Sequence, residues 1–223
     1  MINAIEINNL TKTFKIPHEK SRGIKEEVVN LFKKRRGYEE LKVFDNLNLS
    51  IKKGEFIGIT GPNGVGKSTL LKIIAKVIQP TSGKVHINGK ISPFLELGTG
   101  FQNELTAREN IFLYGAILGL TRKEVREKFD EIVTFSGLKK FLDTKLKNFS
   151  SGMMARLGFS IAIHVNADIL LVDEVLAVGD EEFQKKCYKI FNKFKKEGKT
   201  IVLVSHDKEA IKRFCNREMS LRK

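Results

Sequence analysis

Cysteines are few and long apolar runs are missing, and each absence excludes a class of protein. Cys187 and Cys215 are the only cysteines among 223 residues. Two cysteines make no disulfide framework, and these two lack CxxC or zinc-ligand spacing, a usage that fits a reducing compartment. No apolar run approaches the roughly 20 residues that span a bilayer, and residues 1–10 lack a signal-peptide pattern. We therefore expect a cytoplasmic globular protein.

Acidic side chains are scarce relative to basic ones. The chain has 26 Asp and Glu against 40 Lys and Arg, a net charge of +14. Such an excess is compatible with nucleic acid, an anionic membrane surface or phosphorylated ligands as partners. Much of it lies in short runs such as residues 33–36 and 139–147, which usually form solvated faces. Charge alone therefore selects no partner.

The strongest positive signal lies in residues 52–78. Phe56–Thr60 predicts a short apolar strand, and residues 61–68 read G-P-N-G-V-G-K-S, the complete GxxxxGK[ST] phosphate loop. An apolar helical face follows, made of Leu70, Leu71, Ile73, Ile74 and Val77. Strand, glycine loop and helix form the context that this motif requires.

The residue types of the loop suit phosphate binding. Its glycines let the backbone N–H groups point inward, and the helix starting near Lys67 adds the positive end of its dipole. Lys67 neutralises terminal phosphates, and the Ser68 hydroxyl can ligate Mg²⁺. The predicted nucleotide-binding residues are Gly61, Pro62, Asn63, Gly64, Val65, Gly66, Lys67, Ser68 and Thr69.

A second polar group follows the predicted strand at residues 169–172. Asp173 and Glu174 come directly after it, and the next strand, within residues 199–207, ends at His206. Ligands of open α/β sheets bind beyond the carboxyl ends of the strands, so these side chains can face the phosphate loop. One carboxylate can hold Mg²⁺ and the next can orient or deprotonate an attacking water, whereas His206 can reach a γ-phosphate.

The order of these motifs resembles the ATP-binding cassette (ABC) family. Between the phosphate loop and Asp173 lies F-S-S-G-M at residues 149–153, similar to the family's LSGGQ signature. Ser150 matches the signature serine and Gly152 its second glycine. The resemblance implies an α/β fold: a P-loop NTPase with a RecA-like core, an antiparallel β subdomain and a helical subdomain.

The resemblance also implies an ATPase that uses ATP and Mg²⁺ as a homodimer. Two copies would pair head to tail and sandwich ATP, so that Ser150 and Gly152 point at the γ-phosphate held by the other copy; Ser150 could equally be a simple N-cap. Lys67, Glu174 and His206 take the catalytic roles. Ser68 and Asp173 hold the metal, and Asp180 matches the aspartate of the D-loop.

Two positions of the family's site stay open in this sequence. The glutamine that contacts Mg²⁺ in relatives has no counterpart at its usual place, and Glu96 is the first candidate, with Gln102 second. The aromatic side chain that stacks on adenine could be Phe14 or Tyr38.

Three short sequence segments narrow the resemblance to cassettes that export polysaccharides such as O-antigen, capsule and teichoic acid. They are SSGM at residues 150–153, DEVLAVGD at 173–180 and ELGTGF at 96–101. The implied function is an ATPase subunit, peripheral on the cytoplasmic face of the membrane, that powers export of a lipid-linked polysaccharide through a polytopic permease. Alternatives are another exporter or a nucleic-acid-associated cassette; the absence of sustained heptads or a helix-turn-helix argues against nucleic acid.

Residues 22–38 form an insertion with amphipathic character. Ile24, Val28, Leu31 and Phe32 share one helical face, and basic residues take the other. The helix could pack on its own domain, or lie near the membrane boundary and contact anionic lipid or an anionic lipid-linked glycan.

We assign residues 1–223 to one ABC ATPase domain with a helical lobe at about 104–165. Two T-x-x-E capping boxes, Thr106/Glu109 and Thr121/Glu124, predict the starts of its helices. We hypothesise that the natural chain continues into a C-terminal carbohydrate-binding domain.

Overall fold

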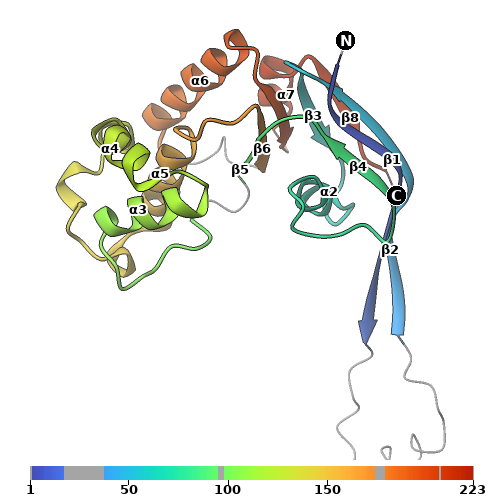
Figure 1. Ribbon diagram of the computed structural model, residues 1–223, viewed down its shortest axis with the longest axis horizontal. Coiled ribbons are helices and arrows are strands. Elements are labelled where there is room, and N and C mark those ends of the chain that lie inside the picture. Colours follow the sequence, from blue (N-terminus) through green and yellow to red (C-terminus); the bar gives the residue numbers. More distant parts are fainter. Residues whose placement is uncertain (1, 18–37, 95–97, 174–178, 206, 223) are drawn as a thin grey trace, which may run out of the picture.

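The computed structural model describes residues 2–17, 38–94, 98–173, 179–205 and 207–222. Its elements, shown in Figure 1, are β1 (Asn3–Pro17), β2 (Tyr38–Lys52), β3 (Phe56–Thr60), α2 (Lys67–Ile74), β4 (Ser82–Ile87), β5 (Ile91–Phe94), α3 (Ala107–Ile117), α4 (Arg122–Ser136), α5 (Ser151–Ala162), β6 (Ile169–Asp173), α6 (Glu181–Lys196), β7 (Thr200–Val204), α7 (Lys208–Phe214) and β8 (Arg217–Ser220). Two short 3₁₀ turns, Lys139–Phe141 and Leu146–Asn148, precede α5.

A five-stranded parallel sheet in the order β5-β6-β7-β3-β8 forms the centre. Every residue of β7 is buried, and so is every residue of β6 except Asp173 at its end. Continuous burial is typical of parallel strands covered on both faces. Beyond β8, the Leu221 N–H donates to the Thr60 carbonyl at 2.8 Å, so the chain past β8 still borders the end of β3.

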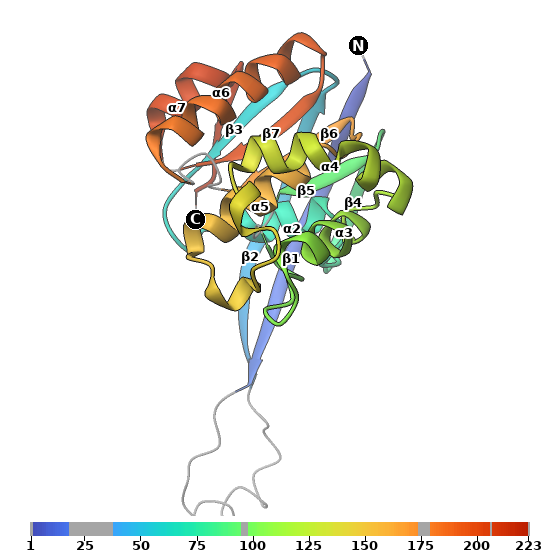
Figure 2. The same ribbon diagram turned by 90° about the vertical axis from the view of Figure 1, so that its left-hand side faces the viewer.

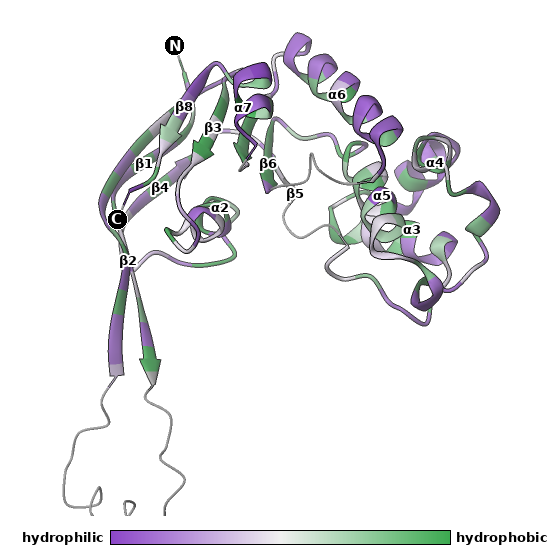
Figure 3. Ribbon diagram, turned by 180° about the vertical axis from the view of Figure 1, so that it is seen from behind, coloured by the Kyte–Doolittle hydropathy of each residue, from purple (hydrophilic) through white to green (hydrophobic). Residues whose placement is uncertain are grey.

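Different elements cover the two faces of the parallel sheet. On one face, Leu70 and Leu71 of α2 pack with β1 side chains such as Ile5 and Ile7. On the other face, α5, α6 and α7 supply a phenylalanine-rich layer: Phe159, Phe183, Phe191, Phe194 and Phe214. Figure 3 shows hydrophobic residues along β3 and hydrophilic ones along much of α6, which buries only one side.

The antiparallel sheet has the order β2-β1-β4 and ends in a long hairpin. The pairing of β1 with β4 ends at Thr11, whereas its pairing with β2 continues to Pro17 opposite Tyr38. Figures 1 and 2 show this end of the hairpin projecting from the rest of the molecule. Apart from Tyr38, the expected amphipathic helix at 22–38 lies outside the described residues.

Helices α3, α4 and α5 pack together around a separate group of buried side chains that includes Ile111, Val125 and Leu157. Both predicted capping boxes are confirmed: the Thr106 and Thr121 side chains accept from the N–H groups of Glu109 and Glu124, which bond back to the capping residues. The expected fold, with a parallel core, an antiparallel β subdomain and a helical subdomain, is confirmed.

One expectation about α2 is wrong. The apolar face was expected to continue to Val77, but the helix ends at Ile74 and Val77 is 69% exposed. The reason is Lys76, whose φ of 61° reverses the chain so that the N–H groups of Val77 and Ile78 both donate to the Lys72 carbonyl. Within the described parts of the chain, we find no helix with the length and apolarity needed to cross a bilayer.

Candidate nucleotide site

The phosphate loop connects the end of β3 to the start of α2. Gly66 precedes the helix with φ 109° and supplies no side chain to cap it. The first N–H groups of α2 are therefore not capped by a side chain at that position, which is the arrangement in which helix termini bind anions.

Gly64 and Gly66 both require a positive φ, 74° and 109° respectively. A Cβ at Gly66 would lie 2.5 Å from Val43 Cγ1 and 2.9 Å from Phe44 Cζ, whereas a Cβ at Gly64 would meet no atom within 4 Å. The loop thus packs tightly on β2 at one glycine and opens to free space at the other.

Lys67 lies folded over this loop. Its Nζ donates to the Gly61 carbonyl at 2.8 Å and to the Pro62 carbonyl at 3.0 Å, and the residue is only 7% exposed. A buried ammonium held by two carbonyls can exchange them for phosphate oxygens, which satisfy its charge better.

A cavity of about 360 Å³ opens beside the loop. One end is apolar, with Phe14 from β1 and Leu41 and Val43 from β2; the other end is the phosphate loop, represented by Asn63, Gly64, Gly66, Lys67, Ser68 and Thr69. The Phe14 ring also lies 4.7 Å from Lys12 Nζ, a cation–π contact. Tyr38 is 54% exposed at the outer end of the hairpin and does not line this cavity.

Asp173 ends β6 at the same edge of the sheet as the phosphate loop. Its strand pairs with β7, which pairs with β3, and α2 packs against β6. Ser68 is exposed in the first turn of α2, and Asp173 is half-buried. Hydroxyl and carboxylate oxygens are donors that Mg²⁺ prefers, so this pair fits a magnesium ion bridged to phosphate.

Three predicted site residues, Glu96, Glu174 and His206, lie outside the described residues. The second glutamine-loop candidate, Gln102, is described and exposed. Buried Asn110 fixes its backbone: the Gln102 N–H donates to Asn110 Oδ1 at 2.8 Å, and Asn110 Nδ2 donates to the Gln102 carbonyl at 3.0 Å.

The signature segment begins α5 as expected for an N-cap. Ser150 Oγ accepts from the Met153 N–H at 3.2 Å. A Cβ at Gly152 would have only Ser150 Oγ within 4 Å, at 3.9 Å. Figure 1 shows α5 and α2 well apart along the long axis, so within one chain the signature helix does not meet the helix that follows the phosphate loop.

Comparison with known proteins decides the family. The family model described as "ABC transporter" matches residues 44–177. The O-antigen export system ATP-binding protein RfbB of Klebsiella pneumoniae is 44% identical over 218 residues, 96% of this chain and 87% of the relative. The chain belongs to the ABC transporter family. It is an ATP-binding cassette, the ATPase unit of that family.

Other similar proteins extend the comparison. The cassette is 43% identical to the teichoic acids export ATP-binding protein TagH of Lactococcus lactis over 96% of its own length, but spans only 45% of that relative. Among solved structures, the dimeric cassette MJ0796 bound to ADP and Pi superposes with a TM-score of 0.77 at 28% identity, covering 98% of this chain and 94% of the other.

Asp180 of the cassette caps α6. Its Oδ1 accepts from the Phe183 N–H at 2.9 Å, and its Oδ2 accepts from Arg156 Nη1 at 3.2 Å. Sequence reasoning overlooked Arg156. A signal was present, because Arg156 is the one charged side chain in the otherwise apolar or small run of α5, Ser151–Ala162.

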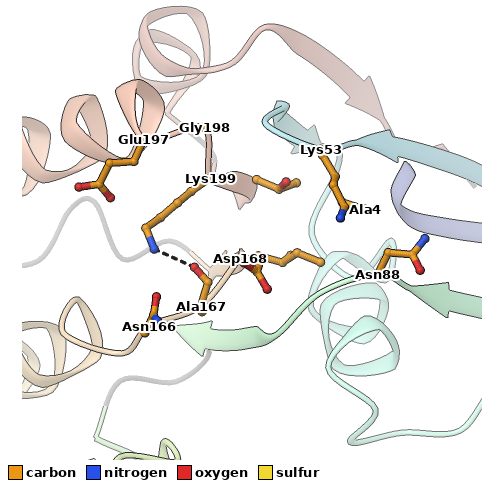
Figure 4. Close-up of a pocket in the computed structure, with 11 residues that line it drawn as sticks. Ala4, Lys53, Asn88, Asn166, Ala167, Asp168, Glu197, Gly198 and Lys199 are labelled. Atoms are coloured by element: carbon orange, nitrogen blue, oxygen red, sulfur yellow. Dashed lines mark hydrogen bonds between the residues drawn. The ribbon is translucent and has the colours of Figure 1, made fainter. Parts of the chain in front are cut away.

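A second cavity of the cassette, of about 260 Å³, lies at the opposite edge of the parallel sheet (Figure 4). Residues before β6 and β7 line it, and Lys199 Nζ donates there to the Ala167 carbonyl at 2.8 Å. This cavity lies where β6 and β7 begin, whereas the phosphate loop lies where β3 ends. Ligands of such sheets bind at the carboxyl ends of the strands, so the second cavity is not part of the nucleotide site.

Proposed function

We propose that this cassette is the ATP-hydrolysing subunit that powers export of a lipid-linked polysaccharide across the cytoplasmic membrane. The observation that carries the proposal is the 44% identity, over almost the whole chain, to an O-antigen export ATP-binding protein. The similarity to a teichoic acids export protein supports export as the direction of transport.

Lys67 and the backbone N–H groups of the phosphate loop, which Pro62 lacks, bind the phosphates of ATP. Ser68 and Asp173 would hold Mg²⁺, with Glu96 or Gln102 as a further ligand. When bound, Mg²⁺ offsets the negative charge that spreads over the phosphate oxygens during phosphoryl transfer. The apolar end of the cavity receives the base, and Phe14 is the aromatic side chain placed to stack on it.

The active site is completed by a second copy. Glu174 orients and polarises the attacking water, and His206 stabilises the γ-phosphate. Ser150 and Gly152 contribute to the nucleotide held by the other copy, and Asp180 lies in the interface between copies. The distance between α5 and α2 in one chain supports this division, as does the dimeric state of the solved cassette.

The other partners are a polytopic permease and the membrane surface. Residues 22–38 join the two strands of the projecting hairpin and carry the basic, amphipathic pattern that favours anionic lipid or an anionic lipid-linked glycan. The cassette would then be peripheral on the cytoplasmic face of the inner membrane, without nucleic acid as a partner.

Complementation in the native host tests the function. Deleting the gene should abolish the surface polysaccharide and leave lipid-linked polymer inside the cell, and the wild-type gene should restore export. Lys67→Ala should not restore it, whereas Lys53→Ala, a change outside the phosphate loop, should. Normal surface polysaccharide in the deletion strain would contradict the proposal and favour another exported substrate.

A further inference from the structure

Arg156 connects three elements through one side chain. Its Nε donates to the Ser136 carbonyl at the end of α4 at 3.1 Å, and its Nη1 donates to Asp180 Oδ2 at 3.2 Å. The guanidinium carbon lies 5.1 Å from the centroid of the Phe183 ring in α6. The signature helix is thereby joined to the end of α4 and to the start of α6.

The surroundings hold this guanidinium in one orientation. The Arg156 side chain is 23% exposed. A Cβ at Gly137, the positive-φ residue that ends α4, would lie 2.8 Å from Arg156 Nη2. The guanidinium is planar, with directed donors on two sides and an aromatic ring nearby. It loses less conformational entropy per contact than an ammonium group would, so lysine cannot reproduce the arrangement.

Asp180 divides its two oxygens between two tasks. Oδ1 caps α6 through the Phe183 N–H, and Oδ2 binds Arg156. Arg156 therefore joins the helix that Ser150 caps to Asp180, the residue proposed to lie in the interface between copies.

We propose that Arg156 is a positioning residue that couples the signature helix α5 to Asp180 at the start of α6. Through Asp180 it fixes the direction in which Ser150 is presented to the second copy relative to the start of α6. It touches neither nucleotide. This inference rests on the proposed nucleotide sandwich.

Two substitutions separate the coupling from helix capping. Arg156→Met removes the donors but retains much of the volume. Asp180→Asn retains an oxygen that can accept from the Phe183 N–H but removes the charge that Arg156 binds. Arg108→Met is the matched control, because Arg108 also binds a carboxylate, Asp143 at 3.0 Å, and lies 5.5 Å from a ring centroid, that of Phe129.

The readouts are steady-state ATP hydrolysis, ATP affinity measured by fluorescent-nucleotide titration, and ATP-dependent dimerisation in a Glu174→Gln background measured by analytical ultracentrifugation. We expect Arg156→Met and Asp180→Asn each to lower kcat about tenfold or more and to weaken dimerisation, with ATP affinity of the monomer within about twofold of wild type. The kcat of the double variant should be no lower than that of either single variant. The kcat of Arg156→Lys should lie between those of Arg156→Met and the wild type.

The outcomes discriminate clearly. Arg108→Met should leave kcat within about twofold even if its thermal stability falls as much as that of Arg156→Met. A folded Arg156→Met or Asp180→Asn variant with wild-type kcat would overturn the inference alone, and so would additive losses in the double variant. If Arg156→Met does not fold, Asp180→Asn decides the question. A wild-type cassette without ATP hydrolysis or ATP-dependent pairing would overturn the proposed function and this inference together.

Discussion

Gly64 and Gly66 both have a positive φ but face different surroundings, and this difference predicts different defects. Gly66→Ala forces a Cβ against Val43 and Phe44, so positive-φ strain of about 1–2 kcal/mol adds to overpacking of about 1–3 kcal/mol. The expected result is a destabilised protein. Urea unfolding measures it directly.

Gly64→Ala should leave the fold largely intact. Its Cβ meets no atom of the chain within 4 Å, so only the strain of about 1–2 kcal/mol remains. Because Gly64 lines the cavity, we expect a loss of ATP affinity of about tenfold, equal to 1.4 kcal/mol. Unfolding curves that rank the two variants in the opposite order would contradict the packing described for the loop.

Phe14 and Tyr38 form a second pair at the residue scale. Base stacking on an aromatic side chain is worth about 1–3 kcal/mol, so Phe14→Ala should raise the Kd for ATP by about 5-fold to 150-fold. Tyr38→Ala, at the exposed end of the hairpin, should leave the Kd unchanged. Titration with a fluorescent ATP analogue measures both, and equal effects would reject Phe14 as the stacking residue.

Asn110 of α3 holds residues 102–106, the segment directly before that helix, through side-chain hydrogen bonds. It is fully buried, and its Nδ2 donates to the carbonyls of Gln102, Leu105 and Thr106, while its Oδ1 accepts from the Gln102 N–H. Each of the three carbonyls also accepts a backbone N–H bond, from Leu105, Leu146 and Asn110 respectively, so Asn110→Ala leaves only the Gln102 N–H without its partner. The variant should cost about 1–3 kcal/mol of unfolding free energy. Exposed Asn103, in the same connection, is the control, since Asn103→Ala should cost less than about 0.5 kcal/mol.

The capping boxes of α3 and α4 predict sensitivity to acid. Hydrogen bonds from the side chain and the N–H of Thr106 hold the pKa of Glu109 below its ordinary value of 4.5, and the N–H and side chain of Thr121 do the same for Glu124. A lowered folded-state pKa gives stability that is present above the unfolded value and lost as the pH falls through the folded value. Thermal melts from pH 7 to pH 3 should show this loss below about pH 4.5.

The double variant Glu109→Gln, Glu124→Gln is the control for that melt series. Glutamine retains the capping geometry and removes the titration. The part of the acid-induced loss of stability that comes from the two capping boxes should be absent in this double variant. An unchanged pH profile would assign the acid sensitivity to other carboxylates.

Local sequence patterns predicted one strand and the starts of two helices correctly. Phe56–Thr60 is β3 as expected, and the two T-x-x-E boxes begin α3 and α4, because the signals for these starts lie within a few residues. The end of α2 was not predicted, since a positive φ at Lys76, which is not a glycine, leaves no mark in an apolar pattern. Arg156 was missed for a related reason: its partners Ser136 and Asp180 lie 20 and 24 residues away and meet only in the folded chain.

At the scale of the whole molecule, both thiols lie in the layer between the parallel sheet and helices α6 and α7. Burial raises the pKa of Cys187 to about 12 and that of Cys215 to about 11. At pH 8 neither thiol should react quickly with Ellman's reagent in the native protein, and both should react at once in urea. Rapid native labelling of Cys187, which is 1% exposed, would contradict the packing of this layer.

The neighbours of β3 also bear on how the protein is made. The strand in front of the phosphate loop lies between β7 and β8, and Leu221 bonds back to Thr60. A nascent polypeptide that stops before Thr200 has neither neighbour of that strand, so nothing holds the phosphate loop in place. The ATP site therefore cannot form before β7 and β8 have been made, and fragments that stop short of these two strands should not compete with the intact protein for ATP.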